Sequence, residues 1–184
     1  MTTNFTYRLI AENDLTPDDH QRISGLLVKA FPNDVEIFSQ ASYCYSLPEY
    51  RLLIEGEQGV VIAHLDFERR MISVGGEEIY VAGVGEVATN PDYHRQGFGS
   101  KLMNKLTAIL TDEFPVDYGI LQCSDTNALF YGQVGWYRIH QPLHRLYQGE
   151  FATVADGDVM ILPVRKTIDE WQSDAVIDLR GESW

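Results

Sequence analysis

Residues 87–100 read VATNPDYHRQGFGS, and this stretch decides the fold of the 184-residue chain. Val87 closes an apolar strand pattern, Pro91 marks a turn, and Gly97 and Gly99 lead into a segment with apolar residues at helical spacing. That spacing is carried by Leu102, Met103, Leu106, Ile109 and Leu110. The stretch therefore predicts a strand, a turn and a glycine-rich loop that opens an amphipathic helix.

A loop of this kind predicts a phosphate site. The first backbone N–H groups of a helix have no intrahelical acceptor, the helix dipole favours an anion there, and glycine lets a phosphate approach the backbone. Leu102 stands where the dinucleotide fingerprint requires a third glycine, and the spacing is not that of a Walker A loop. A dinucleotide-dependent oxidoreductase is therefore disfavoured. The alternative is that the glycines only end a strand and begin a helix.

The loop resembles the acyl-CoA pyrophosphate loop of the GNAT superfamily of N-acetyltransferases, whose pattern is Arg/Gln-x-x-Gly-x-Gly/Ala. This chain departs from the pattern at His94, which replaces the usual Arg or Gln, and at Arg95, which replaces a small residue. Neither change removes a backbone donor. The resemblance implies acetyl-CoA as cosubstrate, with its extended pantetheine arm paired to the strand edge. The cofactor-binding residues implied are Val87, Ala88, Thr89, His94, Arg95, Gln96, Gly97, Phe98, Gly99 and Ser100.

Residues 127–136 resemble the second characteristic block of the same superfamily, a short helix that carries an Asn and an aromatic-Tyr pair and ends at Gly. The resemblance places Tyr131 near the CoA sulfur, as general acid for the departing thiolate. Asn127 is expected to bind the pantetheine arm. Gly135 is typical of the left-handed residue that follows a helix. The alternative for Tyr131 is a packed aromatic residue.

Glu86, at the end of the strand before the loop, is the best-placed carboxylate to take the proton of an attacking amine. Burial among apolar neighbours would raise its pKa toward the range of a general base. A solvated or ion-paired strand acid is the alternative, and backbone carbonyls and waters are other candidates for the same role. By loop alignment the family's catalytic Glu falls at Gly85, and a shift of one residue changes the face of a strand unless a bulge intervenes.

The C-terminal segment resembles that of the aminoglycoside 2'-N-acetyltransferases, on residues 156–164 and 177–184 and on Phe31 to Asp34. This resemblance assigns Asp34, Asp178, Glu182 and Trp184 to the binding of a cationic amino sugar. The tail also resembles that of the nodulation-factor N-acyltransferases, which acylate a glucosamine amine. The alternative is a structural strand that closes the sheet.

Composition agrees with one α/β domain over residues 1–184, without linker or repeat. The net charge of −13 disfavours nucleic acid and anionic membranes, and residues 150–184 hold eight acids against three bases. The chain shows no signal peptide or membrane span, so we expect a cytoplasmic protein. Cys44 and Cys123 are expected to be reduced and structural, and the five histidines predict no metal site.

The expected fold is a GNAT-type mixed, mainly antiparallel sheet with helices on both faces. Strands are expected at residues 7–11, 51–55, 60–67, 71–74, 79–89, 118–123, from 136 and at 159–164, with helices from 17, at 35–41, from 99 and at 127–134. The expected function is direct transfer of an acetyl group from acetyl-CoA to a primary amine of an aminoglycoside or other amino sugar. A homodimer is implied by the resemblance. A non-catalytic acyl-CoA sensor and an N-acyltransferase with a longer acyl donor are the alternatives.

Overall fold

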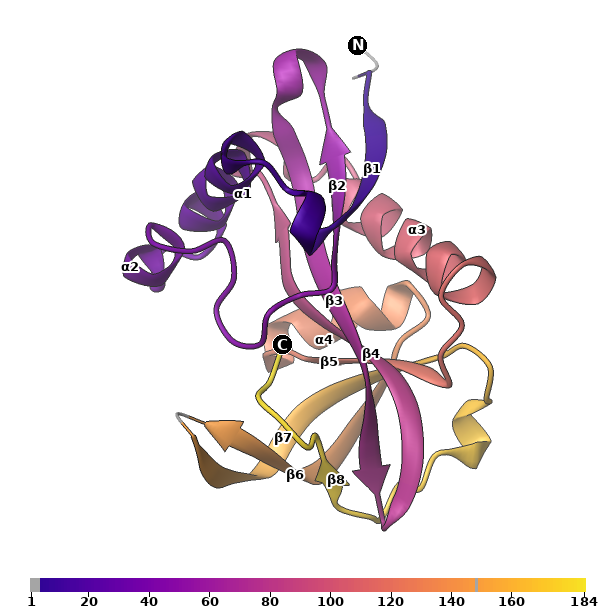
Figure 1. Ribbon diagram of the computed structural model, residues 1–184. Coiled ribbons are helices and arrows are strands. Elements are labelled where there is room, and N and C mark those ends of the chain that lie inside the picture. The colour runs from indigo at the N-terminus through magenta and orange to yellow at the C-terminus, as the bar shows by residue number, and fades with distance from the viewer. Residues whose placement is uncertain (1–3, 148) are drawn as a thin grey trace. The chain divides into compact units, whose positions relative to one another are not determined.

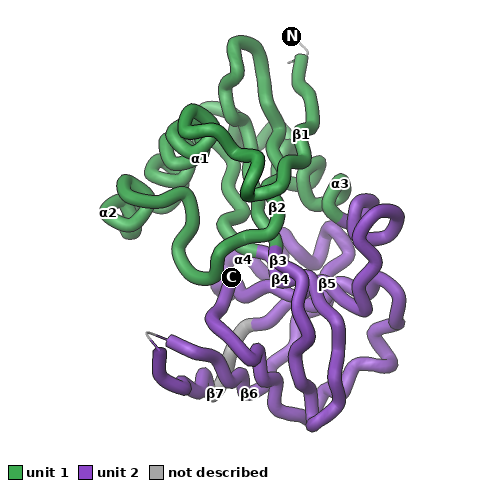
Figure 2. The backbone as a smooth tube through the Cα atoms, in the orientation of Figure 1, with its two compact units in different colours: residues 1–67, 85–106 green, residues 68–84, 107–184 purple. Residues whose placement is uncertain are grey.

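The structure is a computed structural model that describes residues 4–147 and 149–184, with the backbone alone described at residues 155–158. The chain divides into two compact units, residues 1–67 with 85–106 and residues 68–84 with 107–184 (Figure 2). We refer to them as unit 1 and unit 2. Strands β3 (Val61–Val74) and β4 (Glu77–Thr89) and helix α3 (Phe98–Asp112) each run through both units.

Unit 1 is built on antiparallel strands. Strand β1 (Thr6–Ala11) pairs with β2 (Tyr50–Glu55), and β2 pairs with the first half of β3. Helices α1 (Pro17–Ala30) and α2 (Val35–Phe38) lie on one side of these strands and the start of α3 on the other (Figure 1). Short 3-10 turns complete the unit at Glu12–Asp14 (η1), Glu57–Gly59 (η2) and Pro91–Tyr93 (η3).

Helix α1 begins where the sequence predicts it. The Thr16 hydroxyl accepts from the Asp19 N–H at 3.2 Å, and the Asp19 carboxylate accepts from the Thr16 N–H at 3.0 Å, which forms a capping box. The buried face of the helix packs against the strands and α2. This core of unit 1 comprises Ile23, Leu26, Leu27, Phe38, Leu53, Val61 and Ala88.

Unit 2 carries the mixed part of the sheet. Strand β5 (Tyr118–Gln122) runs parallel to β4 and antiparallel to β7 (Glu150–Pro163), and β7 forms a long antiparallel pair with β6 (Tyr137–Tyr147). Strand β8 (Ile177–Asp178) is antiparallel to β3 and parallel to β6. Helix α4 (Asp125–Gln133) and the turn η4 (Ile168–Glu170) complete the described elements.

The predicted fold class is confirmed. Among the described residues the strands are hydrogen-bonded in the order β1-β2-β3-β4-β5-β7-β6-β8, and most neighbouring pairs are antiparallel. The hairpin expected at Gly75 and Gly76 joins β3 to β4, with φ of +61° and +91° at the two glycines, a conformation that glycine adopts without strain. The prediction of one domain remains a prediction.

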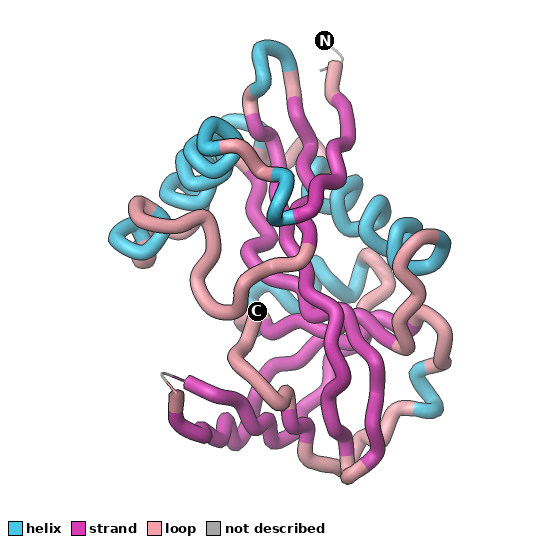
Figure 3. Tube along the Cα trace, in the orientation of Figure 1, coloured by secondary structure: helices cyan, strands magenta, loops and turns pink. Residues whose placement is uncertain are grey.

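Strand β3 corrects the prediction of two strands that end at Phe67 and begin at Met71. It is one uninterrupted strand of 14 residues (Figure 3). The charged residues at 68–70 keep their place in the strand because their long side chains pack on aromatic rings: Arg69 lies 4.5 Å from the Phe114 ring centroid and Arg70 lies 4.1 Å from that of Trp184.

The C-terminal region also differs from the prediction. Strand β7 begins at Glu150, nine residues before the expected strand at Val159, and β6 is its antiparallel partner. The short strand β8 was not among the strands expected from the residue pattern, but it agrees with the alternative for this tail, a structural strand that closes the sheet. Its Ile177 is fully buried in the core of unit 2, which shows that part of the C-terminal tail is structural.

Candidate active site

The glycine-rich loop joins η3 to α3 in a conformation suited to an anion. Arg95 and Gly97 have φ of +61° and +76°, and the Lys101 N–H donates to the Gly97 carbonyl at 3.1 Å. The N–H groups that precede this bond in a helix have no such acceptor. A Cβ built on Gly97 meets no atom within 4 Å, so the space above the loop is open. The backbone therefore fits a phosphate.

The side chains of the loop have separate roles. His94, Arg95 and Gln96 are exposed, and His94 Nε2 contacts the Thr89 carbonyl at 2.9 Å, which ties the loop to the end of β4. Phe98 is buried against Phe5, with ring centroids 5.4 Å apart. Any contact of Phe98 with a ligand must therefore come from its backbone, whereas its side chain anchors the start of α3. Gly99 and Ser100 are half-buried in the first turn of that helix.

The end of β4 presents a strand edge. The pairing between β4 and β5 stops at Gly83, before the three residues expected to bind pantetheine. Of these, Ala88 points into the core of unit 1, while Val87 and Thr89 are half-buried. The Thr89 carbonyl is already engaged by His94, so the groups left for an extended ligand strand belong mainly to Val87 and Ala88.

Glu86 interrupts the regular strand. Its φ of +42° is unusual for a residue other than glycine, and it breaks the alternation of faces along β4, as a bulge does. One carboxylate oxygen, Oε1, accepts from the Cys44 N–H at 3.0 Å, and the Glu86 carbonyl contacts His64 Nδ1 at 3.0 Å. The loop alignment places the family's catalytic Glu at Gly85, one residue before Glu86. The distorted backbone at Glu86 is the kind of local irregularity that allows such a shift of one residue. Glu86 is half-buried.

A buried polar cluster lies beside Glu86 and was not predicted. Arg51 is fully buried, and its guanidinium donates to Glu12 at 2.6 Å, to Asp66 at 2.9 Å and to the Ser42 carbonyl at 2.6 Å. His64 Nε2 lies 3.4 Å from the same guanidinium. The sequence carried one sign of this cluster. Side chains alternate between the two faces of a strand, and the polar residues His64 and Asp66 share one face of an otherwise apolar strand.

The protonation states within this Arg51 cluster follow from burial and charge. Burial and the neighbouring Arg51 charge lower the pKa of His64 to about 3, so the ring is neutral and Nδ1–H donates to the Glu86 carbonyl. Burial, the charge of Glu86 and a hydrogen bond with Glu86 raise the pKa of Asp66 well above its usual value. Burial opposes the charge of Arg51, yet Glu12 and Asp66 hold its pKa above the ordinary value.

Tyr131 lies in α4 with only 7% of its surface exposed. Burial, followed by the charge of Cys123, raises the pKa of its phenol, so Tyr131 keeps its proton at neutral pH. Its ring packs on Phe130 and Trp136 at 5.0 and 6.2 Å. Gly135 follows the helix with φ of +90°, as predicted. Asn127 is exposed in the first turn, where its N–H donates to the Ser124 carbonyl at 2.9 Å.

The four residues expected to bind substrate have different surroundings. In unit 1, Asp34 is exposed at the start of α2. In unit 2, Asp178 accepts from the Arg180 N–H at 2.9 Å, and the Glu182 carbonyl accepts from Arg70. The Trp184 ring covers Gly83 and Arg70, and its indole N–H donates to Glu68 at 3.2 Å. These contacts give Trp184 a packing role in unit 2.

Cys44 and Cys123 are half-buried and form no disulfide with each other. Burial raises the pKa of the Cys44 thiol, which makes it a poor nucleophile at neutral pH. Within residues 4–147 and 149–184, His, Cys, Asp and Glu side chains form no group of three able to hold a metal ion. No helix in the described part of the chain has the length and apolar character needed to span a membrane.

The chain is similar to known proteins over almost its whole length. The family model described as Nodulation protein A (NodA) matches residues 2–183. Nodulation protein A of Azorhizobium caulinodans is 26% identical, over 98% of this chain and 85% of the relative, and that of Rhizobium meliloti strain 1021 is 25% identical, over 98% of each.

Solved structures share the fold. The GNAT family N-acetyltransferase YhbS from Escherichia coli, solved in complex with CoA, has a TM-score of 0.64 at 16% identity, over 97% of this chain and 91% of that chain. Tetrahymena GCN5 has a TM-score of 0.61 at 14% identity, over 89% and 99%. Of the two subfamily resemblances noted in the sequence, the nodulation group is the one that the family model matches. The chain therefore belongs to the nodulation protein A family and is an N-acyltransferase of GNAT fold.

Proposed function

We propose that this enzyme transfers an acyl group from an acyl-CoA thioester to the primary amine of an amino sugar, without an acyl-enzyme. The single observation that carries the proposal is the loop at Gly97, with its positive φ, the open space above it and the helix start behind it. Backbone N–H groups at that helix start suit a pyrophosphate. The exposed Arg95 side chain adds donors to the backbone groups.

The transfer step forms a bond between the amine nitrogen and the acyl carbonyl carbon and breaks the carbon–sulfur bond, whose electron pair stays on sulfur. The nitrogen loses a proton, which goes to the Glu86 carboxylate as general base. Glu86 suits this role because its oxygen Oε1 is fixed by the Cys44 N–H at 3.0 Å. Burial raises the pKa of the Cys44 thiol, which supports direct attack by the amine over a covalent intermediate on Cys44.

Tyr131 is the proposed general acid that protonates the departing thiolate. Its raised pKa keeps the phenol protonated, as the role requires, although a high pKa also makes it a weak acid. Tyr131→Phe should therefore slow transfer while leaving the KM for acyl-CoA unchanged. Tyr137→Phe, an exposed tyrosine in β6, is the matched control. Equal rates in the two variants would remove the acid role and leave Tyr131 a packed aromatic residue.

The acceptor is proposed to be a glucosamine-type amino sugar, because the family match is with the nodulation proteins. An aminoglycoside is the second acceptor to test, since it is a polycation and the chain carries a net charge of −13. Asp34→Asn and Asp178→Asn should raise the KM for a polycationic acceptor and leave that for a glucosamine oligosaccharide unchanged. The homodimer and the cytoplasmic location remain predictions, testable by sedimentation and by fractionation.

The decisive experiment measures thiol release and product mass with purified protein, a panel of amines and two donors, acetyl-CoA and a long-chain acyl-CoA. The amines are glucosamine, a chitooligosaccharide with one free amine, an aminoglycoside and spermidine. Turnover with an amino sugar supports the proposal, and the faster donor defines the acyl chain. CoA binding without turnover of any amine would instead indicate a non-catalytic acyl-CoA sensor.

A further inference from the structure

A cavity of about 520 Å³ lies in unit 1 between helix α1 and residues 39–43, the segment that leads from α2 toward β2 (Figure 1). We refer to it as the α1 pocket. Its volume falls within the range of about 300–1,000 Å³ that is typical of sites for small molecules. The polar side chains that line it include His20, Gln21, Ser24, Gln40, Ser42 and Tyr43.

The lining of the α1 pocket suits a neutral polar ligand. Among the described residues that form it, none is an acid, a lysine or an arginine. Hydroxyl, amide and imidazole groups offer both donors and acceptors, as the hydroxyl groups of a sugar ring require, whereas a polycation finds no carboxylate there. A second cavity of unit 1, of about 350 Å³, is lined by Arg22 and Lys29 and suits an anion instead.

Much of the hydrogen-bonding capacity of the α1 pocket is unused inside the protein. His20 Nδ1 lies 2.8 Å from Ser42 Oγ, and within the described part of the chain His20 Nε2 has no hydrogen-bond partner. The side chains of Gln21, Ser24 and Gln40 make no hydrogen bond to any other described residue. These groups are therefore available to a ligand in place of water.

The buried wall of the α1 pocket is fixed by Arg51. Ser42 is only 3% exposed, and Arg51 donates to its carbonyl at 2.6 Å and to its Oγ at 3.4 Å. Because a guanidinium group only donates, the hydrogen of the Ser42 hydroxyl has His20 Nδ1 as its acceptor. In this tautomer the ring hydrogen of His20 is on Nε2, which makes that N–H a donor to the pocket.

The segment at residues 39–43 also connects the α1 pocket to the proposed base. Tyr43 lines the pocket, and the next residue, Cys44, donates its N–H to Glu86 Oε1 at 3.0 Å. Consecutive Cα atoms are about 3.8 Å apart, so the pocket ends within one residue of the group that holds the base. An oligosaccharide whose amine lies at Glu86 therefore reaches the pocket with its next ring.

We propose that the α1 pocket binds the uncharged sugar ring next to the amine-bearing ring of an oligosaccharide acceptor. The inference rests on the proposed function and adds the part of the site that recognises the length of the acceptor. The His20 Nε2–H, the Ser24 hydroxyl and the Gln40 amide bind the hydroxyl or N-acetyl groups of this ring. The pocket thus selects an oligosaccharide over a single amino sugar, and a neutral neighbouring ring over a cationic one.

The first test compares a chitooligosaccharide with one free amine and glucosamine as acceptors, in wild type and in Ser24→Trp. The indole fills the α1 pocket, so kcat/KM for the chitooligosaccharide should fall to the value for glucosamine. The KM for acyl-CoA and kcat/KM for glucosamine should stay as in wild type. Lys29→Trp is the control, since it adds the same ring to the same helix at the other cavity of unit 1. A preference for the oligosaccharide that is absent in wild type, or that survives Ser24→Trp, overturns the inference.

A matched pair of changes at His20 tests the donor and serves also where Ser24→Trp does not fold. In His20→Asn the side-chain amide reaches only to the place of Nδ1, whereas the longer side chain in His20→Gln carries its amide to the place of Nε2. His20→Asn should raise the KM for the chitooligosaccharide by about 3- to 10-fold, the effect of one neutral hydrogen bond. His20→Gln should recover most of this loss, with kcat unchanged in both. Equal KM values would contradict the assignment of this donor to His20.

A binding measurement separates the inference from the proposed function. The fully N-acetylated disaccharide of glucosamine has no free amine and cannot react, so NMR of nitrogen-15-labelled protein follows its binding alone. The backbone amide signals of residues 39–44 should shift in wild type and in Lys29→Trp but not in Ser24→Trp, and spermidine should leave them in place. Binding elsewhere, or no binding, overturns the inference, whereas a lack of turnover in the amine panel counts against the proposed function alone.

Discussion

The interiors of the two units differ in the kind of polar side chain that they bury. In unit 2 the core is apolar, and the buried polar side chains include Gln141 and Ser183. The Gln141 amide donates to the Gln172 and Ala175 carbonyls at 2.6 Å each, and its oxygen accepts from the Trp171 indole at 2.7 Å. The Ser183 hydroxyl donates to Gln122 at 2.7 Å. In unit 1, Arg51, His64 and Asp66 are buried charged or titratable groups beside Glu86.

This difference indicates that the groups able to take part in the reaction lie in unit 1. A neutral hydrogen-bonded amide fixes a structure at modest energetic cost, whereas buried charges are expensive and are retained mainly where a site needs them. In unit 2 the Gln141 amide therefore positions β6 against the segment at 172–175. In unit 1 burial and the neighbouring charges set the protonation state of the Asp66 carboxyl. Four sets of substitutions test this comparison.

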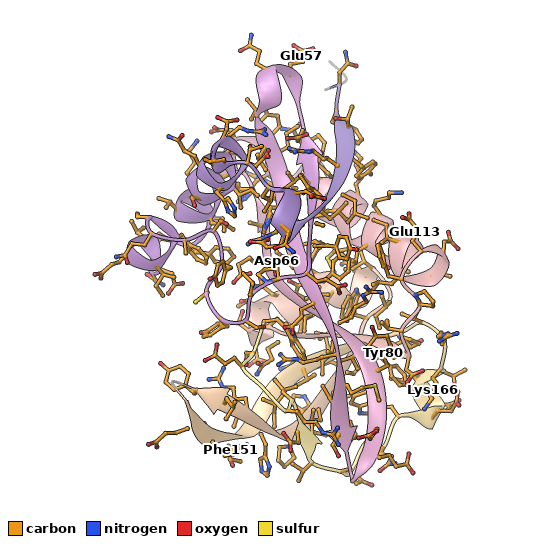
Figure 4. The ribbon with its side chains drawn as sticks, viewed as in Figure 1. Glu57, Asp66, Tyr80, Glu113, Phe151 and Lys166 are labelled. Atoms are coloured by element: carbon orange, nitrogen blue, oxygen red, sulfur yellow. The ribbon has the colours of Figure 1, made fainter. Side chains whose placement is uncertain are left out.

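The largest effect is expected for Glu86→Gln, which removes the proposed base and leaves the contact with the Cys44 N–H possible. The value of kcat/KM should fall about 10²–10⁴-fold with the fold retained, as judged by circular dichroism. Glu57→Gln, an exposed residue in the η2 turn (Figure 4), should be neutral. Full activity in Glu86→Gln would transfer the base role to a carbonyl or a water.

The second largest effect is expected on the stability of the fold at acid pH, which depends on the buried His64 ring. Its folded pKa of about 3 is below the unfolded value of 6.5, so between these values the unfolded chain binds a proton that the folded chain excludes. Stability should therefore decrease as pH falls through this window, by at most about 5 kcal/mol at about 1.36 kcal/mol per unit. In His64→Gln, urea unfolding at a series of pH values should show a shallower slope. An unchanged slope would contradict the burial of a neutral ring.

A direct contrast of the two interiors comes from Arg51→Met and Gln141→Leu. The first leaves Glu12 and Asp66 without their cation and should lower the free energy of unfolding by about 3–5 kcal/mol at neutral pH. The second leaves the Trp171 indole and two carbonyls unpaired, for about 1–3 kcal/mol. Denaturant titration measures both. Equal losses would show that the two clusters are energetically alike.

The smallest effect is expected at the glycine loop. Gly97→Ala places a Cβ in open space but in a left-handed conformation, at a cost of about 1–2 kcal/mol. The KM for acyl-CoA should rise by roughly 10-fold, since 1.36 kcal/mol is tenfold in a constant, with kcat little changed. His94→Ala and Arg95→Ala separate side-chain from backbone contacts. Unchanged affinity in both would show that the backbone alone holds the phosphate.

Much of the fold was predictable because its signals are local. The capping box at Thr16, the turn at Gly75 and Gly76, and the helix after Gly97 each depend on residues a few positions apart. The continuity of β3 was not predictable, because Arg69 and Arg70 find their aromatic partners at Phe114 and Trp184, more than 40 positions away.

The candidate site divides in the same way. The sequence predicted the loop, Glu86 and Tyr131 as site residues, because each lies in a motif or beside one. It did not identify Arg51 or Asp66, since a strand register that places residue 51 opposite residue 66 cannot be read from either segment alone. Polar residues at 64 and 66 in an apolar strand were the available hint.

By itself the sequence determined most strands and a helix that starts behind a glycine loop, because backbone preferences and hydrophobic periods act over a few residues. The GNAT-type sheet was implied by the resemblance of two motifs to that superfamily. Only the tertiary structure decided how Glu86 is oriented and what surrounds its carboxyl. A positive φ at a glutamate costs energy and persists only when distant groups compensate it. Here the Cys44 N–H and the His64 ring hold Glu86 from 42 and 22 positions away in the chain, and folding alone brings them to it.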